Sequence, residues 1–136
     1  MRKARPKFRV MAFAKSFREL DVYKIGRELS NKIYQLSRGF PAEERYSLTD
    51  QIRRSSRSVG AQISEAWAKR RYKRHFIAKL TDADGEQQET QHWILSGLDS
   101  NLIGQEQAKQ LLAEYEILGM KLQTMITKAD QFCWED

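Results

Sequence analysis

Two patterns in this 136-residue sequence combine residue types that could do chemistry. The first is Glu89-Thr-Gln-His92, which has the Glu-x-x-His spacing of helical sites that hold two metal ions. Such a site needs the motif on two helices, together with further glutamates. The only other histidine is His75, so the second copy is missing. We therefore expect no metal and no cofactor, and we assign Glu89 and His92 to the surface or to packing.

The second pattern is a high local density of basic residues. Three arginines follow one another closely on the outer side of a predicted helix, and residues 69–74 contain five bases around an aromatic residue. Basic side chains contact phosphates, and aromatic rings stack on unpaired bases. The candidate nucleic-acid-binding residues are Arg53, Arg54, Arg57, Lys69, Arg70, Arg71, Tyr72, Lys73 and Arg74. The alternative is a solvated helix junction with Trp67 and Tyr72 packed inward.

Other catalytic signatures are missing from the sequence. It contains no Gly-x-Ser-x-Gly elbow, no phosphate loop and no dinucleotide fingerprint. Cys133 has no base near it in the sequence, and we interpret it as an unremarkable free thiol. We therefore expect a protein that is not an enzyme.

The charge is unevenly distributed along the chain, whose formal net charge is +6. Residues 1–18 hold seven Lys/Arg and no Asp/Glu, which fits a nucleic-acid tether or a solubilising tail. Residues 38–75 hold ten basic and four acidic residues, whereas residues 76–136 hold four basic and eleven acidic residues. This asymmetry indicates either contact with nucleic acid or contact between basic and acidic surfaces of neighbouring subunits.

The sequence favours a cytoplasmic protein. A single cysteine forms no internal disulfide, as expected in a reducing compartment. The basic start is followed by too short an apolar stretch for a secretory signal. No apolar run approaches the roughly 20 residues that span a bilayer, so we expect no membrane association.

Scarce glycine and proline favour long helices, and four segments have helical periodicity. They span residues 17–37, 48–68, 72–96 and 105–127. The first segment has apolar residues at steps of three or four from Val22 to Leu36. The inward positions of the second are Leu48, Ile52, Ser55, Val59, Ile63 and Ala66; those of the third are Phe76, Leu80, Ala83, Gln87, Thr90 and Ile94; and those of the fourth are Leu111, Leu112, Tyr115, Leu118, Leu122 and Met125.

Capping residues and turns set the expected ends of these helices. Ser16 with Glu19, and Ser47, are N-terminal capping candidates, and Gly104 is a third. Residues 97–101 form the clearest predicted loop. Since short connections make neighbouring helices antiparallel, we predict an all-α, up-down-up-down four-helix bundle over residues 17–128. Residues 1–16 would be a flexible basic arm and residues 129–136 a tail.

Several stretches resemble a known family. They are Phe17–Lys24, Phe40–Arg54 with Leu48-Thr-Asp-Gln-Ile-Arg-Arg54, Ser58–Ala66, and more loosely Phe76–Leu80, Ala83–Gly85 and Glu89. Together they are similar to the four-helix-bundle proteins encoded by intervening sequences of bacterial 23S rRNA genes, the S23-like family. The resemblance covers about residues 17–128. It implies an antiparallel bundle that assembles into a ring-like homopentamer with no established enzymatic activity, and a related group binds nucleic acid through a basic pentameric barrel.

Two functions remain open from the sequence. In the first, the oligomer binds structured RNA or another nucleic acid through the basic candidates, and recognises the shape of the RNA. In the second, the protein is a structural or protein-interaction scaffold, in which the basic half of one subunit contacts the acidic half of the next.

Overall fold

The computed structural model describes residues 5–6 and 14–135. Within them lie four α-helices: α2 (Asp21–Ser37), α3 (Asp50–Ala68), α4 (Lys73–Asp99) and α5 (Gln105–Thr127). Short helical turns flank them: η1 (Phe17–Glu19), η2 (Ala42–Glu44), η3 (Arg45–Thr49) and η4 (Ala129–Gln131). The two-residue strands β1 (Arg5–Pro6) and β2 (Trp134–Glu135) pair antiparallel.

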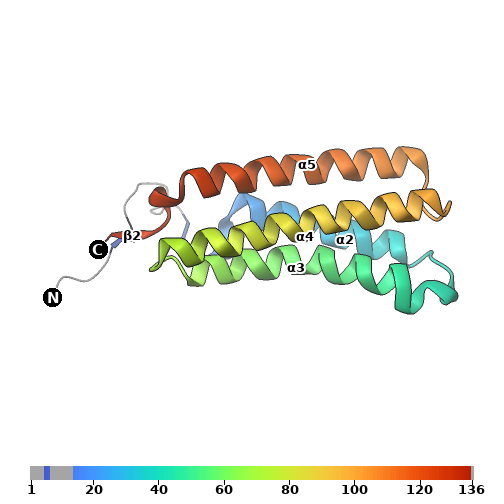
Figure 1. The fold of residues 1–136 in the computed structure, drawn as a ribbon, viewed down its shortest axis with the longest axis horizontal. Helices are drawn as coiled ribbons and strands as arrows, with labels where there is room; N and C mark the ends of the chain where they lie inside the picture. Colours follow the sequence, from blue (N-terminus) through green and yellow to red (C-terminus); the bar gives the residue numbers. More distant parts are fainter. Residues whose placement is uncertain (1–4, 7–13, 136) are drawn as a thin grey trace.

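The four helices form one bundle, and Figure 1 shows the chain direction reversing at each connection. α3 packs most extensively against α4 and also against α2, α5 packs against α4, and contact between α2 and α5 closes the bundle. The prediction of an all-α four-helix bundle is confirmed. No helix of the described residues is long and apolar enough to cross a membrane.

The core follows the predicted helical stripes. All six inward positions of α3 and its preceding turn, and all six of α4, are buried. On α5 the same holds except for Leu112, which is partly buried against the core. Apolar residues at helical spacing therefore determine which face of each helix packs inward.

Several polar side chains of the core pair with one another, although the hydroxyl of the buried Tyr115 has no partner among the described residues. The hydroxyl oxygens of Ser55 on α3 and Thr90 on α4 lie 2.8 Å apart, and both residues are fully buried. Gln87 donates to Asp84 and accepts from Gln91, each at 2.8 Å. A buried polar group without a partner is costly, so this pairing lets polar side chains occupy core positions.

Small residues bring α2 and α3 close together. A Cβ atom on Gly26 of α2 would lie 3.3 Å from Cγ1 of Val59, and one on Gly60 of α3 would lie 3.4 Å from Cε1 of Tyr23. Gly60 of α3 and Gly26 of α2 therefore allow close packing between these two helices of the bundle.

The first two helices begin differently from the prediction. Ser16 accepts from the backbone N–H of Arg18, but the turn it caps is 3₁₀ and α2 starts only at Asp21, because Leu20 is extended. Before α3, Glu44 rather than Ser47 accepts a backbone N–H, that of Leu48. Ser47 has non-helical backbone angles inside the turn η3. Gly104 is the N-cap of α5 as predicted.

The predicted loop at residues 97–101 is shorter than expected. α4 continues to Asp99, and the chain turns at Asn101, whose φ is 60°. Gly97 is helical and buried, and it accepts the backbone N–H groups of Leu102 and Ile103. Glycine is present here because Ile103 packs directly on the helix backbone, not because the chain turns.

The C-terminal segment packs on the bundle, whereas we expected a tail outside it. Ala129, Phe132 and Cys133 are buried, and the Phe132 ring stacks on Phe76 with centroids 6.0 Å apart. The apolar side chains of this segment continue the core past the end of α5. Most of the predicted arm, residues 1–4 and 7–13, lies outside the described residues.

Replacing Gly97 by alanine should destabilise the bundle. The added Cβ would lie 2.5 Å from Cδ1 and 2.8 Å from Cγ1 of Ile103, a side chain that is only 2% exposed. Because Ile103 must shift within a packed core, we expect Gly97→Ala to lower the free energy of unfolding by about 1–3 kcal/mol in urea denaturation.

Gly85 provides the matched control in the same helix. A Cβ there meets no atom within 4 Å. Alanine has the higher helix propensity, so Gly85→Ala should raise the free energy of unfolding by about 0.5–1 kcal/mol. An equal stabilisation by both substitutions would show that Ile103 does not restrict residue 97.

Candidate nucleic-acid interface

The predicted arginines of α3 lie on the side of the helix opposite its buried stripe. Arg54 and Arg57 are exposed, and Arg53 is half-buried at the edge of the α2 contact. Ile52, Ser55 and Val59 occupy the buried face of the same turns. Inward packing of the small and apolar residues therefore directs the arginines outward.

These arginines share a groove with residues that the sequence analysis missed. The groove has a volume of about 660 Å³ and is lined by Arg45, Tyr46, Asp50, Arg53, Arg54 and Arg57, among others. We call it the basic groove. Arg45 and Tyr46 belong to η3, which we expected to be a connection. The signal in the sequence is their position: a helix that begins one turn before Thr49 places Arg45 and Tyr46 beside the arginines of α3.

A tyrosine of α2 holds two of the arginines in place. The guanidinium carbons of Arg53 and Arg57 lie 4.7 and 5.4 Å from the centroid of the Tyr34 ring. Arg53 also donates its Nε–H to Oγ of Ser37 at 2.7 Å. Stacking on an aromatic ring lowers the side-chain freedom of arginine without neutralising its charge.

The positive charge of the basic groove is largely uncompensated. In the described part of the chain, no carboxylate oxygen lies within 4.0 Å of Arg45, Arg53, Arg54 or Arg57. One carboxylate of α4 senses this charge: the pKa of Glu86 is raised by burial and by the charge of Glu89. The charge of Arg54 acts in the opposite direction on this pKa, so Arg54 favours the ionised carboxylate.

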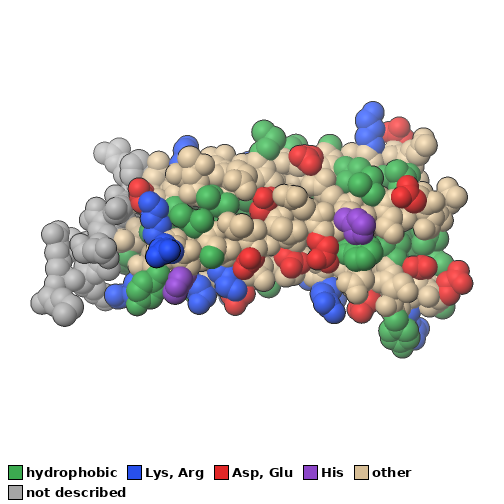
Figure 2. Space-filling view, viewed as in Figure 1, with side chains coloured by type: hydrophobic (Ala, Val, Ile, Leu, Met, Phe, Trp, Pro, Cys, Tyr) green, Lys and Arg blue, Asp and Glu red, His purple; other side chains and the backbone are tan. Residues whose placement is uncertain are grey.

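The second predicted cluster, Lys69–Arg74, forms the turn between α3 and α4, and we call it the basic turn. Lys69, Arg71 and Arg74 are exposed, and Tyr72 is 58% exposed. Tyr72 does not pack inward as the alternative interpretation required; its ring lies 5.4 Å from that of His75. Figure 2 shows Lys and Arg side chains gathered at this end of the bundle.

Two members of the basic turn stabilise the C-terminal segment. Arg70 donates its Nε–H to the backbone oxygen of Trp67 at 2.7 Å, and its guanidinium lies 3.6 Å from the Trp67 ring centroid. The Trp134 ring lies on it at 5.4 Å, and burial lowers the pKa of Arg70. Lys73 pairs with Asp130 at 2.7 Å, and this hydrogen bond raises the pKa of Lys73.

The structure does not bring the two predicted clusters together. Arg54 and Ala68, the last residue of α3, lie about 21 Å apart along the helix, because the rise is about 1.5 Å per residue. Glu65 lies on the helix between them and pairs with Lys79 at 3.7 Å. The candidate residues therefore form two basic surfaces at opposite ends of α3.

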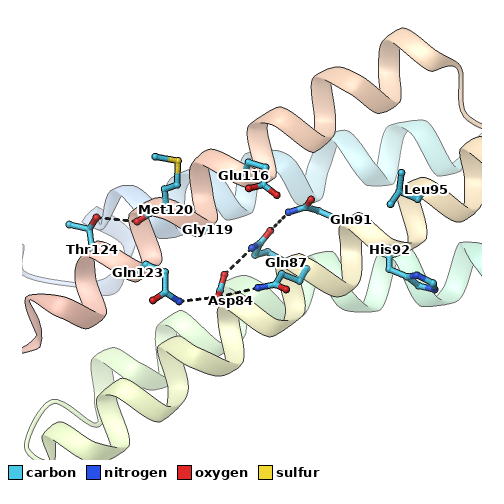
Figure 3. A pocket seen from close by; sticks show the side chains of 11 residues that line it. Asp84, Gln87, Gln91, His92, Leu95, Glu116, Gly119, Met120, Gln123 and Thr124 are labelled. Atoms are coloured by element: carbon cyan, nitrogen blue, oxygen red, sulfur yellow. Dashed lines mark hydrogen bonds between the residues drawn. The ribbon is translucent and has the colours of Figure 1, made fainter.

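A second groove, of different chemistry, lies between α4 and α5. It has a volume of about 750 Å³, and Figure 3 shows Asp84, Gln87, Gln91 and Gln123 joined by hydrogen bonds along it. The exposed apolar side chains of Leu95 and Met120 lie at its edges, and Glu116 adds a second carboxylate. This α4–α5 groove is acidic and partly apolar.

The Glu-x-x-His motif of α4 lies on the surface, where both exposed residues contact Trp93. Glu89 accepts from Nε1 of Trp93 at 3.1 Å, and the His92 ring lies edge-on to Trp93 with centroids 4.6 Å apart. Across the described residues, no group of three or more His, Cys, Asp or Glu side chains is arranged to hold a metal ion.

Fold and sequence together identify the class of protein, a four-helix bundle of the S23 type. The profile of the family described as 23S rRNA-intervening sequence protein matches residues 18–124. This chain therefore belongs to the 23S rRNA-intervening sequence protein family.

One solved structure shares the bundle closely. It is a protein of unknown function from the S23 ribosomal protein family of Bacteroides thetaiotaomicron, with a TM-score of 0.71 and 27% sequence identity. The match covers 77% of this chain and 97% of that chain. A comparison with curated proteins gives no match.

We expect Arg70 to stabilise the fold through its contacts with Trp67 and Trp134, and not through its charge alone. Arg70→Lys keeps the charge but removes the Nε–H donor and the flat surface between Trp67 and Trp134. We expect the free energy of unfolding to fall by about 1–2 kcal/mol in urea denaturation. The exposed neighbour Arg71 is the control, and Arg71→Lys should change it by less than about 0.5 kcal/mol. Equal effects at both positions would refute a structural role for Arg70.

Proposed function

We propose that this chain is a non-enzymatic, cytoplasmic RNA-binding protein that contacts structured RNA through the basic groove and the exposed part of the basic turn. The observation that carries the proposal is the basic groove, in which four arginines converge without a carboxylate within 4.0 Å in the described residues.

The distribution of charge supports binding to the shape of an RNA. Two basic surfaces at the ends of α3 match phosphates that lie about 20 Å apart, a spacing that a folded RNA maintains and a flexible strand does not. Arginine suits this role because its guanidinium donates two parallel hydrogen bonds to a phosphate.

The protein is proposed to work as a homo-oligomer, and the family resemblance suggests a ring-like pentamer. A head-to-tail contact between the basic half of one copy and the acidic α4–α5 groove of the next would close such a ring. The exposed Met120, at 69%, and Leu95, at 46%, favour a contact at the α4–α5 groove. If that contact covers the basic groove, the protein is instead an interaction scaffold.

Neutralising two arginines tests the choice between these functions. Arg54 and Arg57 are exposed and make no ion pair in the described chain, so Arg54→Ser with Arg57→Ser should leave the fold intact. We expect affinity for a structured rRNA fragment to fall about tenfold or more at 0.1 M salt, measured by fluorescence anisotropy, because two phosphate contacts are lost.

The control removes the same charge elsewhere. Lys109 and Lys128 are exposed cations of the acidic half, and Lys109→Ser with Lys128→Ser should leave RNA affinity within about twofold of the parent. Native mass spectrometry of both variants reports the oligomer. Loss of the oligomer with unchanged RNA affinity in the Arg54/Arg57 variant would favour the scaffold and contradict RNA binding through this groove.

A further inference from the structure

The basic groove contains an exposed aromatic residue, Tyr46, which has no role in binding phosphates. Tyr46 is 83% exposed, more than any other large hydrophobic residue in the described part of the chain. It lies in η3, and Leu48, two residues later, anchors this turn in the core. A flat apolar ring is therefore held in solvent at the edge of the basic groove.

The surroundings of Tyr46 are cationic. Arg45 precedes it, and Arg53 and Arg54 line the same groove, in which Asp50 is the one acidic lining residue described. Among the described residues, Arg53 uses only one of its five N–H donors, Nε–H, which donates to Oγ of Ser37. Its terminal nitrogens make no hydrogen bond to another described residue, and the ring of Tyr34 holds the guanidinium in place.

An exposed ring beside several guanidinium groups matches the two chemical parts of a nucleotide. The base has a flat face that stacks on tyrosine, and the flanking phosphates accept hydrogen bonds from arginine. A paired base within a helix presents no free face, so stacking requires a base in a bulge, loop or single strand. The groove volume of about 660 Å³ lies within the range of about 300–1,000 Å³ that is usual for small-ligand sites.

We propose that the basic groove binds one unpaired nucleotide of a folded RNA, with the base stacked on Tyr46 and the adjacent phosphates held by Arg53 and Arg54. This inference rests on the proposed RNA-binding function and makes it more specific. The basic turn contributes charge to the same complex, whereas Tyr46 discriminates an unpaired base from a paired one.

The test uses the full chain and two RNA hairpins that differ in one nucleotide. One hairpin carries a single unpaired adenine bulge, and the other is fully paired. We expect the parent protein to bind the bulged hairpin about tenfold more tightly. Tyr46→Leu should abolish this preference while its affinity for the paired hairpin stays unchanged, and Tyr46→Phe should keep the preference because the ring remains.

Tyr72 offers a matched control, because it is also an exposed tyrosine beside basic residues. Tyr72→Leu should keep the preference for the bulged hairpin. A direct readout replaces the bulged adenine by 2-aminopurine, whose fluorescence should be quenched by the parent, by Tyr46→Phe and by Tyr72→Leu, but not by Tyr46→Leu. Thermal melting by circular dichroism checks that each variant keeps the fold.

Three results would overturn the inference. If the parent bound both hairpins with equal affinity, the groove would not select an unpaired base. A Tyr46→Leu variant that retains the preference, or loses affinity for both hairpins equally, would remove Tyr46 from base recognition while leaving RNA binding intact. Absence of binding to either hairpin at low salt would instead reject the proposed function, and this inference with it.

Discussion

The close packing of α3 against both of its neighbours is the constraint on which the rest of the structure depends. Its buried side carries Ser55, whose hydroxyl pairs with Thr90 of α4, and Gly60, against which Tyr23 of α2 packs. Once these small residues fix the rotation of α3, its arginines must face outward. Tyr34 of α2 then lies beneath two of them. The packing of the core and the position of the basic groove are therefore set by the same helix.

The two ends of α3 serve different purposes. At its N-terminal end the arginines stack on Tyr34 or reach solvent, and the exposed Tyr46 extends the groove. At its C-terminal end the basic residues are divided between solvent and structure. Arg70 lies against Trp67 and Trp134, and Lys73 pairs with Asp130, so part of this positive charge joins the C-terminal segment to the bundle.

Helical periodicity made the bundle predictable, because burial of an apolar stripe is a property that neighbouring residues in the sequence share. The bounds of α5 and the buried polar positions of Gln87 and Thr90 followed from this pattern. What could not be read from the sequence depends on contacts between distant residues. From the sequence, Gly97 is typical of a loop, but in the structure Ile103 packs on it. Phe132 and Cys133 are predicted to lie in a tail, but both are buried in the core. Likewise, a run of basic residues does not reveal that Arg70 is half-buried or that Arg45 and Tyr46 join Arg53.

The central claim is that this bundle holds RNA by the charge of its basic groove and basic turn. Its most direct test is the salt dependence of binding to a structured rRNA fragment by the full chain, with the mass of the oligomer followed in the same buffers. Because each phosphate contact contributes about −0.7 to −0.9 to the slope of log affinity against log salt, several contacts should give a slope of about −4 or steeper at constant mass. Binding that hardly weakens as salt rises, or no binding at low salt, would contradict the claim and favour a protein-interaction scaffold.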